Sequence, residues 1–576
     1  MRLYKSIWRF ASYNELIRVI NSTAITIVLY VVYMSIFVCR MPISYYFFGG
    51  LTQFALVLAI RFSYRFVLLL RSKQNSKDKK NVMIIGAGSA GQMIYRDIKM
   101  SSYLEEKVCC FIDDNTNKHG RDIDGVPVFG GRDRILEAVN TFEIKKIYLA
   151  IPSADAHTKR DLLNICNETS CELMNLPGIY QLATGQVTVN QMKKVSVEDL
   201  LGRDPIKADM HQIYEQLNGK VILVTGGGGS IGSELCRQIA AHGPKQLIIF
   251  DVYENNAYDI QLELKRKYPN LNLVTLIGSV RDSRRIMGVF EKYRPDIVYH
   301  AAAHKYVPLM EDSPCEAIKN NTIGTYKTAF AAMVYGCKRF VLISTDKAVN
   351  PTNIMGATKR TCEMICQSFN QKIKDGKAEE ISQLFTHENE SDKDYLSELR
   401  NAKTEFVAVR FGNVLGSNGS VIPLFKKQIE NGGPVTVTHP DIIRYFMTIP
   451  EAVGLVLQAG YYAKGGEIFV LDMGEPVKID TLARNLIRLS GYKPDVDIKV
   501  EYSGLRPGEK LFEEKLMAEE GLTKTENDLI HIGRPIPFDI DNYLKQLDEL
   551  MDVAYNNDEL KIREMMQEVV NTYHPA

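Results

Sequence analysis

The stretch KVILVTGGGGSIGSELCRQIAAHG, residues 220–243, decides the fold of the larger part of this chain. It has the pattern of an apolar strand, a glycine-rich turn and the first turns of a helix. The turn follows T-G-x-x-G-x-x-G, with its spaced glycines at Gly226, Gly229 and Gly232. Such glycines let backbone N–H groups approach a pyrophosphate, and the helix N-terminus favours its negative charge. The stretch therefore predicts a Rossmann-type dinucleotide site, with Ser230 and Ile231 beside the phosphates.

The neighbouring strands indicate which dinucleotide fits. The second strand, QLIIFD, ends at Asp251, at a distance from the turn that suits an acid on the adenosine ribose. No lysine or arginine occurs from residue 252 to 264, which disfavours an extra 2′-phosphate. We therefore expect NAD rather than NADP. Small residues, Ala301 and Ala302, end the fourth strand and would let the cofactor lie close, and we place Asp282 among the cofactor contacts.

The fifth strand, RFVLISTDKAV, carries polar residues to the edge of the sheet where ligands bind in open α/β folds. It delivers Thr345, Asp346 and Lys347, and an adjacent acid and amine suit proton transfer. Lys359 follows, but Met355 stands where a Tyr-x-x-x-Lys pair would place tyrosine. Because a thioether cannot take a proton, Met355 cannot act as the base.

A second, weaker glycine pattern precedes this region. Residues 81–97, NVMIIGAGSAGQMIYRD, hold Gly86, Gly88 and Gly91, and the next strand ends at Asp113. Packing or regulation explains such a turn as well as dinucleotide binding does, so its ligand stays open. We expect a membrane region at 1–75, a first Rossmann-like domain at 76–205 and the dinucleotide-binding domain at 206–576.

The N-terminal region holds two uncharged apolar stretches, residues 19–39 and 42–60. Each has about the 20 residues that cross a hydrocarbon core as a helix. Basic residues flank the pair: Arg2, Lys5, Arg9 and Arg18 before it, and Arg61, Arg65, Arg71, Lys73, Lys77, Lys79 and Lys80 after it. The positive-inside rule places both flanks in the cytoplasm and predicts a multi-pass hairpin in the plasma (inner) membrane, contacting the lipid bilayer. A buried core hairpin is the alternative.

The overall composition indicates which kinds of partner and ligand the protein is expected to lack. A formal net charge of +1 argues against a nucleic-acid binder. The ten cysteines are scattered and indicate buried thiols. His300 and His304 have the spacing of a metal pair but no accompanying acid or cysteine cluster, so we expect no metal. The charge-dense segment 371–405 is expected to be a solvated, partly helical insertion.

Seven stretches in order resemble one family. They are TGGGGSIG (225–232), HAAAHKYVPLME (300–311), NNTIGT (320–325), STDKAVNPTNIMGATKR (344–360), VRFGNVLGSNGSVIPLF (409–425), RYFMTIPEA (444–452) and GLRPGEKLFEE (504–514). The chain resembles the membrane-anchored nucleotide-sugar 4,6-dehydratases, CapD-like polysaccharide biosynthesis proteins of the extended short-chain dehydrogenase/reductase superfamily. Members often carry four membrane spans, whereas we expect two here, as in a shortened or incomplete version.

The resemblance implies an α/β enzyme with a C-terminal substrate-binding part, and a UDP-N-acetylhexosamine, most plausibly UDP-N-acetylglucosamine, converted to its 4-keto-6-deoxy form. It assigns elimination to Asp346, as the acid toward the carbon-6 hydroxyl, and to a neutral Lys347, as the carbon-5 base. Lys359 would meet the nicotinamide ribose, Thr345 would relay protons and Met355 would pack beside the nicotinamide. The carbon-4 base stays open.

Substrate contacts follow from position and charge. Arg444 and Arg506 suit the diphosphate, Glu509 the ribose and Asn413 the sugar or diphosphate. Lys305 contacts the substrate or is a surface lysine. A homo-oligomer is expected. Alternatives are a 5-inverting dehydratase, a 4-epimerase, which generally needs the tyrosine, and a non-catalytic nucleotide-sugar sensor.

Overall fold

The computed structural model describes residues 13–38, 41–74, 79–101, 104–169, 171–176, 192–195, 199, 210–385, 395–514, 521–533 and 536–575. The chain forms two compact units: Met1–Ser153 with Leu173–Lys193, and Ala154–Glu172 with Lys194–Ala576. The expected α/β class, with two apolar N-terminal helices and two Rossmann-like sheets, is confirmed. The three domain boundaries stay predictions. Arg2, Lys5, Arg9 and Lys77 lie outside the described residues.

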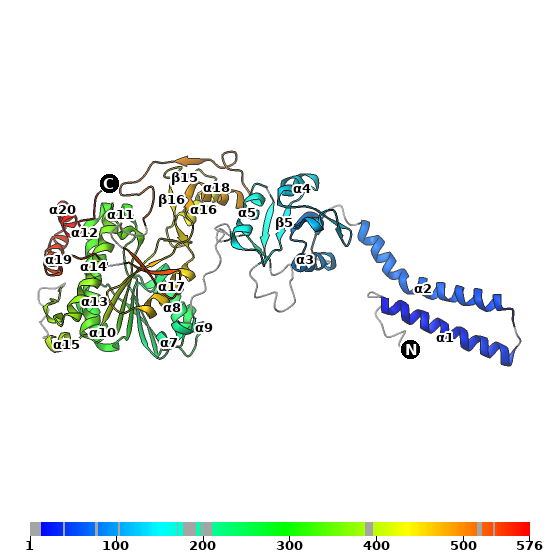
Figure 1. Ribbon diagram of the computed structural model, residues 1–576, viewed down its shortest axis with the longest axis horizontal. Coiled ribbons are helices and arrows are strands. Elements are labelled where there is room, and N and C mark those ends of the chain that lie inside the picture. The colour runs from blue at the N-terminus through cyan, green and yellow to red at the C-terminus, as the bar shows by residue number, and fades with distance from the viewer. Residues whose placement is uncertain are drawn as a thin grey trace. The chain divides into compact units, whose positions relative to one another are not determined.

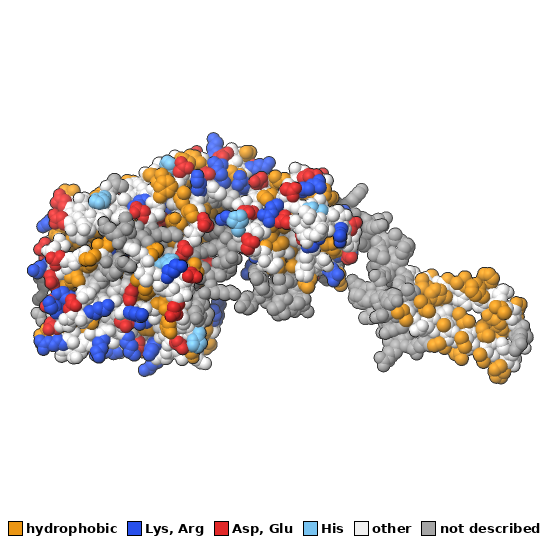
Figure 2. Space-filling model, in the orientation of Figure 1, with side chains coloured by type: hydrophobic (Ala, Val, Ile, Leu, Met, Phe, Trp, Pro, Cys, Tyr) orange, Lys and Arg blue, Asp and Glu red, His pale blue; other side chains and the backbone are white. Residues whose placement is uncertain are grey.

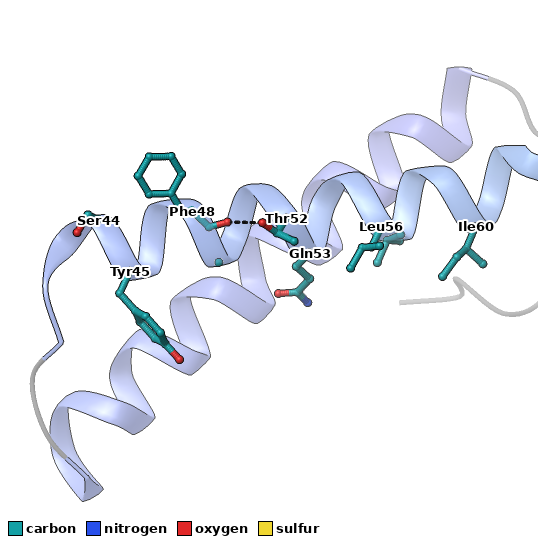
Figure 3. A pocket seen from close by; sticks show the side chains of 9 residues that line it. Ser44, Tyr45, Phe48, Thr52, Gln53, Leu56 and Ile60 are labelled. Carbon is teal, nitrogen blue, oxygen red and sulfur yellow. Dashed lines mark hydrogen bonds between the residues drawn. The ribbon is translucent and has the colours of Figure 1, made fainter.

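The N-terminal helices are α1 (Tyr13–Phe37) and α2 (Ile43–Gln74). Each contains an 18-residue window, Ile20–Phe37 and Ile43–Ile60, that is long and apolar enough to cross a membrane. Only 6% of each window is buried, and hydrophobic side chains cover the outside of the pair (Figure 2). This exposure argues against a buried core hairpin, because apolar side chains of a core would be covered. Figure 3 shows how Phe48, Leu56 and Ile60 project from α2 along a shallow hollow.

The sheet of the first unit has the order β3-β4-β2-β1-β5-β6-β7. Its strands are β1 (Lys80–Ile85), β2 (Glu106–Ile112), β3 (Asp122–Ile123), β4 (Val126–Gly130), β5 (Lys146–Leu149), β6 (Glu172–Asn175) and β7 (Lys193–Lys194). Strand β1 pairs in parallel with β2 and β5, as in a Rossmann unit. Helices α3 (Ser89–Met100) and α4 (Ile135–Thr141) follow β1 and β4.

The second unit is built on a nine-stranded sheet of order β10-β9-β8-β11-β12-β13-β18-β22-β21 (Figure 1). The strands are β8 (Val221–Thr225), β9 (Gln246–Asp251), β10 (Leu273–Ile277), β11 (Ile297–His300), β12 (Arg339–Ile343), β13 (Glu405–Arg410), β18 (Ile468–Leu471), β21 (Leu522–Lys524) and β22 (Ile530–Gly533). The first seven strands of the order are parallel; β22 pairs antiparallel with β18, and β21 pairs antiparallel with β22. The order reverses between β8 and β11, and this is where ligands bind in doubly wound sheets.

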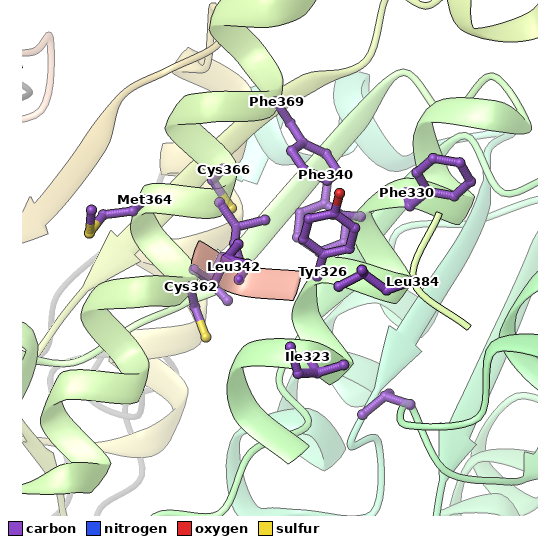
Figure 4. Packing of buried hydrophobic residues seen from close by; sticks show 14 of the residues in the cluster. Ile323, Tyr326, Phe330, Phe340, Leu342, Cys362, Met364, Cys366, Phe369 and Leu384 are labelled. Atoms are coloured by element: carbon purple, nitrogen blue, oxygen red, sulfur yellow. The ribbon is translucent and has the colours of Figure 1, made fainter. Parts of the chain in front are cut away.

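Helices cover both faces of this sheet because alternate strand residues point to opposite sides. On one face, Leu223 and Phe340 pack with α10 (Ser283–Tyr293), α13 (Gly324–Val334) and α14 (Ile354–Lys374). Figure 4 shows Phe340 and Leu342 of β12 among side chains of α13 and α14. The opposite face packs against α7 (Met210–Leu217), α8 (Ser230–Ala241), α9 (Glu254–Lys267) and α17 (Ile449–Tyr462).

The remaining elements lie around this sheet. Helices that extend the first face are α11 (Val307–Asp312), α12 (Pro314–Ala317), the π-helical turn η6 (Ile318–Ile323), α15 (Leu396–Arg400), α19 (Ile540–Tyr555) and α20 (Glu559–Val569). A separate cluster holds α16 (Val421–Glu430), α18 (Ile479–Leu489), β15 (Val435–Val437) and β20 (Val500–Tyr502). Short pairs join β14 (Asn413–Val414) to β17 (Phe446–Met447), and β16 (Ile443–Arg444) to β19 (Val477–Lys478). Helix α5 (Ala156–Asn167) also belongs to the second unit.

The expectation of a solvated insertion at 371–405 is wrong for part of its length. Ile381, Leu384 and Leu399 are buried in the cluster that contains α13 and α14. Residues 386–394 lie outside the described residues. These few apolar residues lie among many charged ones in the sequence, and they attach the segment to the core.

Candidate active site

The glycine turn of the second unit is packed so tightly that side chains would not fit. Gly226 has a φ of +66°, and a Cβ there would lie 2.7 Å from the backbone nitrogen of Ala302. A Cβ at Gly232 would lie 2.0 Å from the carbonyl oxygen of Gly226. The N-terminus of α8 is thereby held against the end of β8, which leaves its backbone N–H groups facing the sheet edge. This cradle fits the pyrophosphate of a dinucleotide.

Asp251 ends β9 beside that turn. Its carboxylate accepts hydrogen bonds from the backbone N–H groups of Gly228 and Tyr253, both at 2.8 Å. The position therefore agrees with an acid that meets the adenosine ribose. Asp282 differs, because its carboxylate accepts from the N–H of Arg285 and caps α10.

The other expected cofactor residues lie around the same turn. Ser230 Oγ accepts from the N–H of Asn418, which ties the loop after β14 to α8. Ile231 packs against the sheet, and Ala301 directly follows β11. Lys359 is buried, and its Nζ donates to the carbonyl of Ile343 at 2.9 Å. Burial lowers the pKa of the Lys359 amine.

The residues at the end of β12 form a compact charged group. Lys347 Nζ lies 3.0 Å from Asp346 Oδ1, 3.1 Å from Asn413 Oδ1 and 2.9 Å from Glu513 Oε1. Thr345 Oγ1 donates to Asp346 Oδ1 at 2.8 Å. Asp346 and Glu513 have side chains that are only 6% and 5% exposed. Two nearly buried carboxyl groups thus share the ammonium group of Lys347, whose side chain is 27% exposed.

The charges of this group push its pKa values apart. Burial raises the pKa of Glu513, and the charge of Asp346 adds to this, so the net shift is upward. Burial also acts to raise the pKa of Asp346, but the Lys347 ammonium and its hydrogen bonds outweigh it and leave that pKa lowered. Burial acts to lower the pKa of Lys347, yet the two carboxylates raise it overall. These contacts favour the ammonium form of Lys347, whereas the carbon-5 base expected above is a neutral amine.

Asp346 also offers an unused acceptor. Its Oδ2 atom is buried and has no hydrogen-bond partner among the described residues. A buried acceptor without a partner costs about 1–3 kcal/mol, so such an atom is commonly completed by a ligand. The open oxygen lies in the site that β12 and β14 form together.

A pocket of about 280 Å³ opens over these groups. It brings together the predicted residues Asp346, Lys347, Asn413, Arg444, Arg506 and Glu509. Arg506 is exposed at the pocket, which suits contact with an anion. Arg444 differs, because it lies 3.2 Å from both Glu509 and Glu513 and also donates to backbone carbonyls. The Arg444 guanidinium is therefore paired mainly with groups of the protein itself.

Four of the expected catalytic and substrate-binding residues lie outside the lining of this pocket: Lys305, Thr345, Met355 and Lys359. Met355 is 3% exposed and packs in the cluster formed with α14. Lys305 is exposed, and partial desolvation together with the charge of Lys347 lowers its pKa. Lys305 therefore lies within electrostatic reach of the charged group.

Sequence reasoning missed Glu513. It lies in the motif GLRPGEKLFEE, from which only Arg506 and Glu509 were selected. The signal available was an acid directly after an apolar pair, Leu511 and Phe512, in a motif already placed at the substrate. The spacing of residues in the sequence does not show that the side chain of Glu513 contacts Lys347.

The turn of the first unit repeats the geometry of the second. A Cβ at Gly91 would lie 1.9 Å from the carbonyl oxygen of Gly86, whereas Gly88 has open space. Asp113 accepts from the N–H of Ala87 at 2.8 Å, as Asp251 does from Gly228. Asp113 also pairs with Lys118 at 2.8 Å.

Comparison with known proteins fits this geometry. The family model described as polysaccharide biosynthesis protein matches residues 222–535, and capsular polysaccharide biosynthesis protein CapD of Staphylococcus aureus is 44% identical over 96% of this chain and 88% of that protein. This chain belongs to the polysaccharide biosynthesis protein family. A model described as CoA-binding domain matches residues 4–177.

Other relatives match about half of this polysaccharide biosynthesis protein. A UDP-N-acetylglucosamine 4,6-dehydratase (inverting) of Campylobacter jejuni is 33% identical over 51% of the chain and 77% of that protein. A UDP-glucose 4-epimerase of Rickettsia akari is 33% identical over 54% of the chain and 80% of that protein. The similarity thus spans enzymes with two different reactions.

Proposed function

We propose that this protein dehydrates a UDP-N-acetylhexosamine, most plausibly UDP-N-acetylglucosamine, to its 4-keto-6-deoxy derivative. The observation that carries the proposal is the buried group of Asp346, Lys347 and Glu513, with an open carboxylate oxygen, at the sheet edge beside a dinucleotide turn. Elimination of water requires both a base and an acid within hydrogen-bond reach of one sugar. This group supplies both kinds of side chain at one pocket.

The proposed cofactor is NAD. The residues that would hold it are Gly226, Gly229 and Gly232 at the pyrophosphate, Asp251 at the adenosine ribose and Lys359 at the nicotinamide ribose. A nicotinamide held by these residues would supply the reversible hydride transfer, from sugar carbon 4 and back to carbon 6, that dehydration requires. The protein's own residues bind the sugar, exclude water and move the protons.

The second candidate function is 4-epimerisation, because the chain is similar to a UDP-glucose 4-epimerase of Rickettsia akari. An epimerase needs a base at the carbon-4 hydroxyl but no acid for a leaving group. The tyrosine that such enzymes generally use is here Met355, which is buried and cannot accept a proton. The two buried carboxyl groups also exceed what epimerisation requires. Dehydration therefore accounts for more of the site.

Mass spectrometry of the reaction tests the proposal. The purified full-length protein is incubated with UDP-N-acetylglucosamine in the presence of NAD. Loss of one water from the sugar, with no net consumption of NAD, is expected. An unchanged mass with inverted carbon 4 would instead establish an epimerase, and tight binding without any product would establish a sensor. Proton spectra of the product give the configuration at carbon 5.

We also propose that α1 and α2 anchor the enzyme in the plasma membrane as a hairpin, with its catalytic unit in the cytoplasm. The support is their length, their apolar windows and their exposure. Cell fractionation tests this: the full chain should stay with membranes after a high-salt wash, and deletion of residues 13–60 should release it. Assembly as a homo-oligomer remains a proposal that sedimentation in detergent can test.

A further inference from the structure

One carboxyl group, that of Glu513, joins three residues that come from different parts of the second unit. Its Oε1 atom lies 2.9 Å from Lys347 Nζ and 3.2 Å from Arg444 Nε, and its Oε2 atom lies 3.3 Å from Asn413 Nδ2. Lys347 follows β12, Asn413 begins β14 and Arg444 ends β16. The side chain of Glu513 is only 5% exposed, so water competes little for these contacts. Three residues expected to act on the substrate thus meet at an acid from a fourth segment.

The contacts indicate which forms of these groups fit together. All three neighbours of Glu513 donate hydrogen bonds and two of them are cations, so a carboxylate fits better than a neutral acid. Burial raises the pKa of Glu513, but the Lys347 and Arg444 cations oppose this shift. Three acceptor oxygens lie within 3.1 Å of Lys347 Nζ, those of Asp346, Asn413 and Glu513. Because an ammonium has three N–H groups and a neutral amine has two, only the ammonium can donate to all three oxygens.

The place of Lys347 in turn fixes the carboxylate of Asp346. Lys347 Nζ and Thr345 Oγ1 both donate to Oδ1 of Asp346, at 3.0 and 2.8 Å. The other oxygen, Oδ2, is buried without a partner among the described residues, and Asp346 lines the pocket. One oxygen of Asp346 is therefore occupied and the other is available. If Lys347 moved away, Oδ1 would lose a donor and the carboxylate would be free to turn.

We propose that Glu513 is a positioning residue of the dehydration site: its carboxylate holds Lys347 in place, so that Asp346 presents Oδ2 to the sugar. This inference rests on the proposed dehydration. Glu513 itself transfers no proton, because its contacts go to donors of the protein. A displacement of about 1 Å among reacting groups can lower a rate by about 10²-fold. The contribution of Glu513 should therefore appear in turnover rather than in substrate affinity.

The variants Glu513→Gln and Glu513→Asp separate charge from reach in the full-length protein. Glutamine keeps the size of the side chain but replaces one acceptor oxygen by an NH₂ group, which would face donors. We expect kcat for dehydration to fall by about 10²-fold in Glu513→Gln, with KM within about 3-fold of the wild-type value. Glu513→Asp keeps the charge at a shorter reach and should lose less of the rate. Exposed Glu475→Gln is the matched control and should dehydrate as the wild type does.

The protonation of Lys347 gives a readout that does not depend on catalysis. Asp346 and Glu513 are the acids that face its ammonium group, and Lys305 and Arg444 are the cations nearby. Glu513→Gln removes one acid and leaves both cations in place. Because an opposite charge within hydrogen-bond distance favours the charged form, its loss should lower the pKa of Lys347 by about 1 pH unit or more. Glu513→Asp keeps the charge and should change this pKa less.

Acetylation measures this change, because acetic anhydride reacts with the neutral amine and not with the ammonium. At pH 9, Lys347 should be acetylated about 3-fold faster or more in Glu513→Gln than in the wild type. The rate is read by mass spectrometry of the peptide that contains Lys347. Exposed Lys499 in the same chain is the internal reference and should react equally in all variants.

The outcomes separate this inference from the proposed function. A normal kcat in Glu513→Gln would overturn the positioning role, and so would a lost rate without faster acetylation of Lys347. If the wild type dehydrates no UDP-N-acetylhexosamine while acetylation still differs between the variants, the proposed function is overturned and the hold of Glu513 on Lys347 stands. All rates are taken at a temperature at which thermal unfolding shows each variant to be folded, so a lost rate is not a lost fold.

Discussion

Lys347 Nζ lies 2.9 Å from Oε1 of Glu513, although 166 residues separate them in the chain. The first residue follows β12 at the sheet edge, and the second comes from the C-terminal segment that closes the pocket. The contact therefore assembles the charged group only when both parts of the second unit are folded. The proposed active site is therefore complete only when both parts of the second unit have folded together.

Removal of the Lys347 ammonium should disable the site. In Lys347→Met, Asp346 and Glu513 lose their shared partner, and the two buried carboxyl groups repel when both are ionised. We expect dehydration to fall by at least about 10²-fold. Lys499→Met, at an exposed position, is the control and should keep the wild-type rate. Full activity of Lys347→Met would remove Lys347 from the site.

Addition of one methyl group to the glycine turn should abolish cofactor binding. In Gly232→Ala, the new Cβ would collide with the carbonyl oxygen of Gly226 at 2.0 Å. We expect the purified variant to lose bound NAD, measured by absorbance of the nucleotide released on denaturation. Gly288→Ala in α10 meets nothing within 4 Å, so it should keep NAD and gain up to about 1 kcal/mol of helix stability. Equal NAD content in both variants would contradict the assignment.

A buried ion pair beneath the site should dominate local stability. Arg410 Nε and Nη2 donate to Glu363 at 2.8 and 2.7 Å, and both side chains are at most 1% exposed. Arg410→Met removes the two-pronged partner of the Glu363 carboxylate and leaves it to Arg360 and Ser344, which costs at most about 3–5 kcal/mol. We expect a clear drop in the thermal unfolding temperature of the second unit. The double change with Glu363→Gln should recover part of it, and no recovery would argue against charge burial as the cause.

His300 should make the protein sensitive to acid. It is fully buried between Thr225 and Thr325, and burial lowers its pKa to about 3. Below the ordinary histidine value of about 6.5, the unfolded chain binds a proton that the folded chain cannot. Stability is thus present above pH 6.5 and is lost as the pH falls toward 3, by at most about 1.4 kcal/mol per pH unit.

Replacement of this histidine provides the check on acid sensitivity. His300→Gln keeps hydrogen-bonding atoms between the two threonines but does not titrate. Its denaturation free energy should fall less steeply than that of the wild type between pH 6.5 and 4.5. Identical slopes for the two proteins would show that other groups carry the acid response.

The apolar hairpin offers a matched pair of glycines. A Cβ at Gly50 would lie 2.6 Å from Cδ1 of Ile27 in α1, whereas Gly49 has nothing within 4 Å. Small residues let helices approach closely within a bilayer. Gly50→Val should therefore separate α1 from α2, and Gly49→Val should not. Cysteines placed at positions 30 and 45, where the tyrosine hydroxyls lie 3.2 Å apart, should crosslink in membranes less efficiently in Gly50→Val alone.

The local parts of the site were predictable from the sequence, because each depends on one short pattern. The turn from Gly226 to Gly232 and the acid at Asp251 follow from glycine spacing and strand length. The charged state of Lys347 was not predictable, since burial alone favours a neutral amine and the second carboxylate comes from Glu513. Long-range contacts of this kind leave no periodic signal in the sequence. The anchors at Ile381 and Leu384 were missed because they lie singly among charges.

Helix α5 belongs to the second unit, where Nδ2 of Asn167 donates to Oδ1 of Asn485 in α18 at 3.1 Å, although β5 and β6 on either side belong to the first. The backbone consequently passes from one unit to the other three times before residue 195. No single cut can yield two intact halves. A recombination event that replaced only one unit would separate α5 from α18. Recombination that keeps this contact must transfer both units together.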